Sequence, residues 1–350
     1  MPKKNKRIIV IVIAAIAVLI GIGGVYAWYN PLLGSKLPDA NVTFDPGLFE
    51  QFPTQQTQVD ETLVDINLDV EESASTPAPV PPQSAIPQQP LCKGPESLSI
   101  LVLGIDEQAQ ADAIRLVRVD FMKGRVFVLS IPRDFYVPIV DMEQHGITQG
   151  RINATYGYGE WFNGRGHGIL SVARNIEYNF GVTFDHYIVL NFDNIADYID
   201  QIGGIEILLD RPVADGTLYF SSGLHQMDGE TAVGFMRMRY YDTDFARIRR
   251  QSMVIRAFYT KAMSELNLIG LTQLALKGLL DKNIQTDFAV KDLSPLLCLA
   301  QRVDGEDVDF VEIPSEMYRP FTTQSGGNVQ VPYDTVVPFI QSVMNGSYQP

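Results

Sequence analysis

The sequence predicts an α/β protein in which an α-β-α sandwich with a central mixed sheet follows one N-terminal transmembrane helix. The first observation behind this is an apolar run, Ile8 to Trp28, directly after a basic segment. The second is a proline-rich tract that separates the run from the remainder of the chain. The third is the alternation of strand-like and helical apolar patterns from Leu98 onward. The chain therefore divides into an anchor, a linker and one large α/β domain.

The N-terminal segment has the features of a retained membrane anchor. The apolar run is long enough to cross a bilayer core as a helix, and we place the span at residues 8–29. The basic side chains within residues 1–7 predict that this tail stays in the cytoplasm. The bulky sequence Tyr26-Ala-Trp-Tyr29 offers no small-residue cleavage site, which favours an anchor over a removed signal peptide. We therefore expect a single-pass protein of the cell membrane whose remaining residues are extracytoplasmic.

Residues 30–97 are predicted to form an extracytoplasmic linker. The tract from Val70 to Pro90 is rich in proline and poor in aromatic residues, so it is expected to stay extended and solvated. The folded domain follows at residues 98–350, with its main motifs in residues 98–265 and a more helical part in residues 266–350.

The first strands of the domain bring acidic residues together. Leu98 to Leu103 predicts a strand, and a hairpin of two strands follows over Ile114 to Phe121 and Arg125 to Ile131. Pro132 cannot donate to a ladder, so it turns Arg133 and Asp134 out of the sheet. With Asp134, the candidates Asp106 and Asp112 are expected at one rim, where they offer the hard oxygen ligands that Mg²⁺ prefers. For each aspartate alone, a turn or capping role is the commoner one.

The rest of the domain alternates helices with strands. Gly168 to Phe180 has a helical pattern, and His186 to Leu209 predicts a strand, a helix and a strand, with Gly203-Gly204 ending the helix. We interpret the second pattern as a βαβ unit. The later predicted elements are helices at Ile255–Leu266, Leu271–Leu280, Asp292–Val303 and Thr335–Met344, and a strand at Val308–Ile313. The apolar excess of these helices is expected mostly in the core, with a lipid groove as the alternative.

The segment Arg237 to Gln251 concentrates five arginines in a chain of formal net charge −14. An extended run over Phe235 to Tyr240 would place Arg237 and Arg239 on one face. Thr243 or Asp244 would then cap a helix, and Arg247, Arg250 and Gln251 fall on one side of it. Guanidinium groups beside a helix start predict a phosphate-like ligand. The alternative is a structural network of arginines with nearby carboxylates.

Composition excludes several classes of protein. The chain contains four histidines without metal-binding spacing and only two cysteines, Cys92 and Cys298, so a zinc enzyme is not expected. The acidic balance argues against a nucleic-acid partner. Neither a phosphate-binding glycine loop nor a serine-nucleophile elbow is present. The two cysteines are able to pair in an oxidising exterior, or both remain free.

The chain resembles the LytR-CpsA-Psr family of membrane-anchored glycopolymer transferases. The motifs that carry the resemblance are, in order, Leu103-Gly-Ile-Asp106, Ala111-Asp112, Leu129-Ser-Ile-Pro-Arg-Asp134, Arg151-Ile-Asn-Ala-Thr-Tyr156, Gly203-Gly-Ile205, Leu224-His-Gln-Met-Asp-Gly229 and Arg237-Met-Arg-Tyr-Tyr-Asp-Thr-Asp-Phe-Ala-Arg-Ile-Arg-Arg-Gln251. The resemblance implies a Mg²⁺-dependent transfer of a glycosyl phosphate from a polyprenyl pyrophosphate carrier to the cell wall, usually peptidoglycan. The lipid tail would lie in an apolar groove, and the pyrophosphate in the arginine cluster.

The resemblance also assigns residues. Asp106 and Asp112 match the family's metal-binding aspartates. The pyrophosphate clamp corresponds to Arg133, Arg237, Arg239 and Arg247, with Arg250 beside it, and supporting polar positions correspond to Gln251 and Asp134. The acceptor's proton would pass to Asp134 or to a metal-ligating aspartate. One departure is Gln110, which stands where the family usually has arginine.

Three other functions compete with the transferase. A polyprenyl-pyrophosphate hydrolase would use the same clamp with water as the acceptor. A non-catalytic protein that binds a lipid-linked polymer would need the groove and the arginines but no reaction. A transcriptional attenuator is disfavoured by the expected extracytoplasmic location and by the acidic charge.

Overall fold

The computed structural model describes Phe49 and residues 90–238, 244–281, 283–303 and 305–349. The predicted tail at residues 1–7, the predicted span at 8–29 and most of the predicted linker at 30–97 lie outside the described residues. Within these described ranges, no helix combines the length and the apolar character that a bilayer crossing requires.

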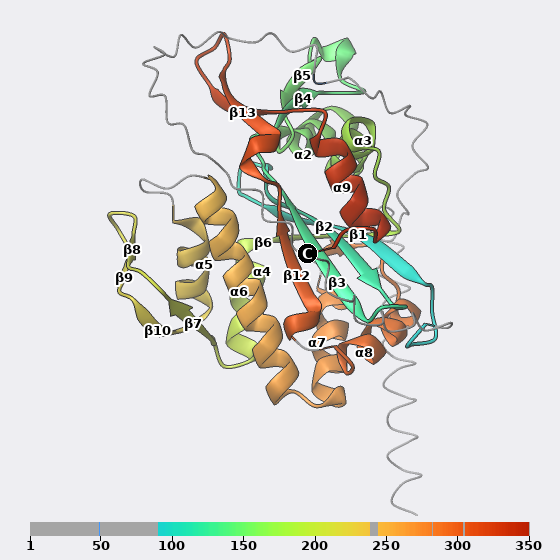
Figure 1. Ribbon diagram of the computed structural model, residues 1–350, viewed down its shortest axis with the longest axis vertical. Helices are drawn as coiled ribbons and strands as arrows, with labels where there is room; N and C mark the ends of the chain where they lie inside the picture. The colour runs from blue at the N-terminus through green and yellow to red at the C-terminus, as the bar shows by residue number, and fades with distance from the viewer. Residues whose placement is uncertain (1–48, 50–89, 239–243, 282, 304, 350) are drawn as a thin grey trace, which may run out of the picture.

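A six-stranded mixed sheet forms the centre of the domain (Figure 1). Its strands, in spatial order, are β11 (Gln285–Thr286), β6 (His186–Asn191), β1 (Ser97–Ile105), β2 (Ala111–Asp120), β3 (Arg125–Ile131) and β12 (Val308–Glu312). The β1–β6 and β3–β12 pairs are parallel, and the other pairs are antiparallel. The predicted mixed sheet and the predicted hairpin of β2 and β3 are thus confirmed.

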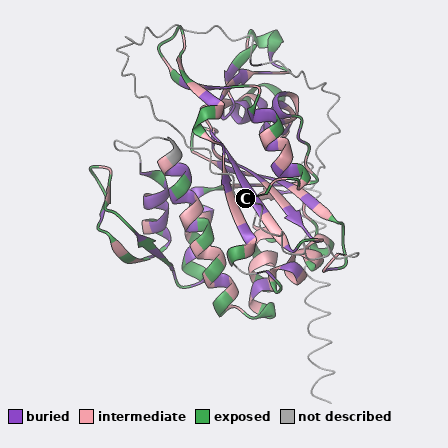
Figure 2. Cartoon of the chain, in the orientation of Figure 1, coloured by how far each residue is buried: buried purple, intermediate pink, exposed green. Residues whose placement is uncertain are grey.

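Helices cover both faces of this sheet. One face carries α2 (Ala154–Tyr158), α3 (Gly168–Phe180) and α9 (Val336–Asn345), and the other carries α4 (Phe192–Gln201), α6 (Asp244–Glu265), α7 (Leu268–Leu280) and α8 (Leu293–Ala300). Side chains alternate between the two faces along each strand, so Leu101 and Leu103 pack toward α3 and α9 while Ile100 faces the other core. Figure 2 shows the central strands largely buried and the outward helix faces exposed.

The predicted βαβ unit is wrong. The strand, helix and strand exist as β6, α4 and β7 (Ile205–Leu209), and the helix ends before Gly203-Gly204 as expected. However, β7 pairs antiparallel with β10 (Gly223–Met227) outside the central sheet. Alternate residues of β7 are buried and exposed, a pattern that suits a ribbon covered on one face, whereas a central parallel strand is buried on both faces.

The extended run predicted at Phe235 to Tyr240 is also wrong where the structure describes it. Helix α5 (Gly229–Arg237) includes Phe235 and Arg237, and its N-cap Asp228 accepts a hydrogen bond from the Thr231 amide at 2.9 Å. Local capping therefore outweighs the alternation of arginines and methionines. Arg239 and Thr243, on which part of the prediction rested, lie outside the described residues.

Smaller elements complete the domain. They are the strand pairs β4 (Tyr136–Pro138) with β5 (Gln149–Arg151), β8 (Val213–Ala214) with β9 (Tyr219–Phe220) and β13 (Tyr318–Thr322) with β14 (Asn328–Pro332), a π-helical turn at Gly159–Asn163, and 3-10 turns at Glu143–His145, Val290–Asp292, Gly305–Asp307 and Ser315–Met317. Cys92 and Cys298 form a disulfide with a Cα–Cα distance of 6.0 Å, which resolves the open question of their pairing.

Candidate functional site

Asp112 is a predicted site residue that several parts of the structure hold in place. In the ladder between β1 and β2, Ile105 pairs with Ala111 and Gly104 pairs with Ala113, so Asp112 is the extra residue of a β-bulge. A bulge turns a side chain away from its regular direction, and such bulges recur beside active sites. Asp112 is only 8% exposed, and arginines from two other elements contact its carboxylate.

Arg133 and Arg247 are the arginines that contact Asp112. Arg133 follows Pro132 at the end of β3, the neighbour of β2, and its Nη1 donates to Asp112 Oδ1. Arg247, on the second turn of α6, places Nη1 3.5 Å from Asp112 Oδ2 and donates from Nη2 to the Asp112 carbonyl at 3.4 Å. Two guanidinium groups therefore converge on one carboxylate, and guanidinium groups are the side chains best suited to bind phosphate oxygens in pairs.

Asp134 extends this cluster on the opposite side of Arg133. Its Oδ2 lies 3.5 Å from Arg133 Nε, and its Oδ1 lies 3.1 Å from Arg151 Nε. Arg151 belongs to a family motif, but no role was predicted for it. Arg133 therefore contacts two carboxylates, those of Asp112 and Asp134, and these contacts hold its guanidinium group in place.

Asp106 lies in the loop between β1 and β2. Its Oδ1 accepts hydrogen bonds from the backbone amides of Gln108 at 3.0 Å and Gln110 at 2.8 Å, and Ala109 adopts a positive φ of 57°. The carboxylate thus shapes the loop that leads into the bulge at Asp112. The turn role that is common for a single aspartate is present here, and the second carboxylate oxygen is left for another ligand.

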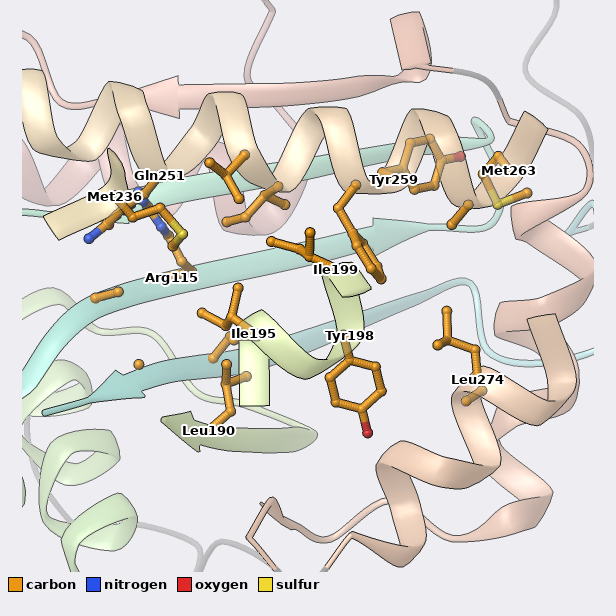
Figure 3. A pocket seen from close by; sticks show the side chains of 18 of the residues that line it. Arg115, Leu190, Ile195, Tyr198, Ile199, Met236, Gln251, Tyr259, Met263 and Leu274 are labelled. Atoms are coloured by element: carbon orange, nitrogen blue, oxygen red, sulfur yellow. Dashed lines mark hydrogen bonds between the residues drawn. The ribbon is translucent and has the colours of Figure 1, made fainter. Parts of the chain in front are cut away.

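A long apolar cavity of about 550 Å³ opens between the sheet and the helices α4, α6 and α7. Figure 3 shows Arg115, Gln251 and Met236 at one end, and Tyr259, Met263 and Leu274 toward the other. Apart from Arg115, the side chains that line the cavity are uncharged. Burial raises the pKa of Tyr198 to about 12, which keeps its phenol neutral.

The polar end of the cavity adjoins the charged cluster. Ala113, which lines this end, follows Asp112 directly, and Gln251 lies one helical turn beyond Arg247. A diphosphate bound at the charged cluster would therefore have the apolar cavity beside it.

Arg115 is a site residue that the sequence analysis missed. It lines the cavity, is buried, and donates from Nη2 to Gln251 Oε1 at 2.9 Å. The available signal was a charged residue between the apolar residues Ile114 and Leu116 of β2. Buried arginines need partners, so this position could have been marked as functional.

The remaining predicted arginines have other surroundings. Arg237 is exposed at the end of α5, and its Cζ lies 4.5 Å from the ring centroid of Phe192, a residue that lines the cavity. Arg250 is buried and donates to the Met238 carbonyl, which ties α6 to the end of α5. Arg239 lies outside the described residues.

Comparisons with known proteins agree on one family. The LytR_cpsA_psr family model matches residues 56–335. A relative from Oceanobacillus iheyensis, named polyisoprenyl-teichoic acid–peptidoglycan teichoic acid transferase TagU, is 31% identical over 213 residues. That match covers 59% of this chain and 64% of the relative, so it spans less than two thirds of the relative's length.

Solved structures show a similar fold. Bacillus subtilis TagV matches with a TM-score of 0.60 and 22% identity, over 73% of this chain and 99% of that one. A structure of TagT bound to LIIa-WTA matches with a TM-score of 0.57 and 22% identity, over 71% of this chain and 90% of that one. At this level of identity, the likeness establishes the fold alone.

Proposed function

This chain belongs to the LytR-CpsA-Psr family, and on that basis we propose that it is a membrane-anchored phosphotransferase. It would move a glycopolymer from a polyprenyl-pyrophosphate carrier to peptidoglycan or a similar acceptor in the cell wall. The observation that carries the proposal is the contact of Arg133 and Arg247 with Asp112 at the polar end of the apolar cavity. The arginines for the diphosphate and the apolar cavity for the lipid tail therefore lie next to each other.

The arginines supply electrostatic stabilisation. Arg133 and Arg247 donate to non-bridging oxygens of the diphosphate, while Arg115 and Gln251 line the start of the lipid channel. Arg237, stacked on Phe192 near the same cavity, adds a further cation. A phosphoryl transfer asks mainly for positioning and neutralisation of charge, and arginines held in place by the fold provide both.

A divalent ion at the ends of β1 and β2 is part of the proposal, with Asp106 and Asp112 as the residues that would hold it. Asp106 and Asp112 are hard oxygen donors of the kind used for Mg²⁺, which often binds one or two carboxylates together with substrate phosphates. Among the described residues, no group of three or more His, Cys, Asp or Glu side chains is placed to hold a metal by itself. Bound Mg²⁺ would neutralise charge on the diphosphate, and its retention would depend on that substrate.

The reaction has a simple balance. A hydroxyl oxygen of the acceptor forms a bond to the phosphorus that carries the glycopolymer, and the phosphoanhydride bond to the lipid phosphate breaks. Polyprenyl phosphate leaves, and the hydroxyl proton is lost to a base or to solvent. A hydrolase would run the same exchange with water in place of the acceptor hydroxyl.

Two findings support the cellular setting of this proposal. The disulfide between Cys92 and Cys298 is expected in an oxidising compartment, which agrees with an extracytoplasmic domain. The relative named above carries a teichoic acid transferase name. The span at residues 8–29 remains a proposal based on the sequence.

The test uses the full-length chain in detergent with Mg²⁺, a polyprenyl-pyrophosphate-linked glycopolymer and soluble peptidoglycan strands, in water enriched in ¹⁸O. A transferase forms a phosphodiester between polymer and peptidoglycan without ¹⁸O. A hydrolase releases polymer phosphate that contains ¹⁸O. Absence of both products with wild-type protein contradicts any catalytic role, and Asp112→Asn is the inactive control.

A further inference from the structure

A second, polar cleft of about 350 Å³ borders the loop between Asp106 and Asp112. Residues of this loop, of the first helical segment after β5 and of the hairpin β13–β14 line it. Within the described residues, Arg151 is the one charged side chain in its lining. The cleft is therefore polar and almost uncharged, unlike the apolar cavity and unlike the charged cluster.

Aromatic side chains form one part of the cleft. Trp161, in the π-helical turn, is 64% exposed, and Tyr136 and Tyr158 line the cleft with it. The indole is held close to the site loop, because a Cβ added at Gly157 would lie 3.3 Å from Cη2 of Trp161 and 3.0 Å from the Ala109 carbonyl oxygen. An exposed and oriented indole is a surface on which the apolar face of a sugar ring can stack.

Amide groups supply a matched donor and acceptor. Asn153 is buried, and its Nδ2 donates to Gln110 Oε1 at 3.1 Å. Its Oδ1 is buried without a hydrogen-bond partner among the described residues, although the residue lines the cleft. A buried acceptor without a partner costs about 1–3 kcal/mol, so a ligand N–H or O–H there is favoured. Gln110 also lines the cleft, and since its Oε1 accepts from Asn153, its Nε2 is the amide group that remains to donate to a ligand.

The hairpin β13–β14 closes the opposite side. Thr323, Ser325 and Gly327 line the cleft from its turn, and the Gly327 amide donates to Thr323 Oγ1 at 3.0 Å. Arg151 Nη2 donates to the Asn328 carbonyl at 3.0 Å, and the rings of Tyr136 and Phe321 lie 6.3 Å apart. The hairpin is thus held against β4 and β5.

We propose that this cleft binds the acceptor glycan of the transfer, an oligosaccharide of N-acetylated amino sugars. Trp161 stacks on a sugar ring, Asn153 Oδ1 accepts the N–H of an acetamido group, and Gln110 Nε2 donates to its carbonyl. That the bound glycan is the acceptor rests on the proposed function. The binding of the glycan to this cleft does not depend on that function. The cleft adjoins the proposed site through Gln110, which lines it. The Gln110 backbone amide donates to Asp106 Oδ1, and the loop that contains Gln110 leads into Asp112.

The first experiment measures binding without turnover. The chain contains two tryptophans, Trp28 and Trp161, so full-length Trp28→Phe protein reports emission from Trp161 alone. The probes are chitotetraose, which has acetamido groups, maltotetraose, which has only hydroxyls, and glycerol phosphate polymer, which represents a donor chain. We expect chitotetraose to shift the emission with an affinity about tenfold or more above maltotetraose, a difference of about 1.4 kcal/mol.

The isosteric variant Gln110→Glu keeps Oε1 for Asn153 and replaces the donor Nε2 by a carboxylate oxygen. It should lose the preference for chitotetraose. No emission change with saturating chitotetraose overturns the proposal, and an equal response to maltotetraose overturns the acetamido assignment. A response to glycerol phosphate polymer alone assigns the cleft to the donor and also overturns it.

The second experiment measures transfer to soluble peptidoglycan strands. Trp161→Ala should raise KM for the acceptor about tenfold and leave KM for the lipid donor unchanged. The matched control is Tyr219→Ala, which removes an equally exposed aromatic ring, 68% exposed, from β9. An unchanged acceptor KM in Trp161→Ala refutes the inference. A wild-type chain that transfers to no acceptor refutes the proposed function instead, since the binding experiment stands apart from it.

Discussion

Asp112→Asn is the most informative single substitution. Asparagine has the same shape, but it removes the negative charge that Arg133 and Arg247 share. Both guanidinium groups then face a neutral amide, and Arg247 is almost fully buried. The substitution tests whether the bulge positions a charge that holds the cluster together.

The magnitude follows from burial. Breaking a buried ion pair by removal of one partner costs about 3–5 kcal/mol, because the other charge stays buried. For a domain of this size, each 1 kcal/mol lowers Tm by about 2–4 °C, so we expect a decrease of roughly 6–20 °C. The matched control is Asp309→Asn, which removes the partner of Arg125 in a more exposed pair, with side chains 18% and 35% exposed. That change should cost about 1 kcal/mol or less.

The assay is thermal unfolding of the full-length chain with and without inorganic pyrophosphate. Released from Asp112, the two arginines gain most from an added anion, so pyrophosphate should raise Tm more for Asp112→Asn than for wild type. At a concentration 100 times Kd, a ligand stabilises by about 2.7 kcal/mol. If Asp112→Asn lowers Tm no more than Asp309→Asn, or if pyrophosphate raises both proteins equally, the assignment of an anion site to this cluster is wrong.

Three further predictions concern the cavity, the disulfide and the sheet edge. Ala262→Phe narrows the cavity and should weaken binding of a long polyprenyl phosphate by at least about tenfold, since each displaced CH₂ forfeits about 0.8 kcal/mol, while Ser264→Phe on the exposed side of α6 should have no effect. Cys92→Ser removes the disulfide across 206 residues and should lower the free energy of unfolding by about 2–5 kcal/mol, with dithiothreitol having the same effect on wild type and none on the variant. The hydrogen bond to Asp287 raises the pKa of His186. This pair should therefore stabilise the edge of the sheet fully below pH ~6 and progressively less as pH rises through the raised pKa. Denaturant unfolding at several pH values should show this pH dependence of stability in wild type and lose it in His186→Phe.

A specific result would contradict each of these predictions. Equal polyprenyl phosphate affinity in Ala262→Phe and wild type would place the lipid elsewhere. A chain indifferent to dithiothreitol would mean that the disulfide adds nothing to stability. An identical pH slope in His186→Phe would assign the titration to another group.

Much of the fold could be predicted because local patterns and tertiary packing agree there. The helix Gly168–Phe180 has the predicted bounds, since an amphipathic period ends at Gly181, which adopts the left-handed conformation. The first three strands were predicted from their apolar runs. The pairing of β7 was not predictable from its own residues, because pairing depends on a partner strand that lies outside the predicted elements.

The site could be predicted in its residue types but only partly in its contacts. Asp112, Arg133 and Arg247 come from separate parts of the chain, and only the folded sheet brings them together. Arg237 was assigned to a strand, because alternation suggests one, yet the cap at Asp228 starts a helix. Arg115 was missed because β2 contains other charged residues, and nothing in the spacing shows which of them is buried beside Gln251. Nothing in the sequence linked Trp161 with the hairpin β13–β14, which is more than 150 residues away in the chain.

The bond between Cys92 and Cys298 has a mechanical consequence. Strand β1 starts at Ser97 in the middle of the sheet, so tension on the preceding chain would peel this strand from its neighbours one hydrogen bond at a time. The covalent link enters ahead of β1 and diverts that tension into α8. Stretching of the preceding segment would then reach Leu297 and Ala300 of α8, in the wall of the apolar cavity, before it reached β1.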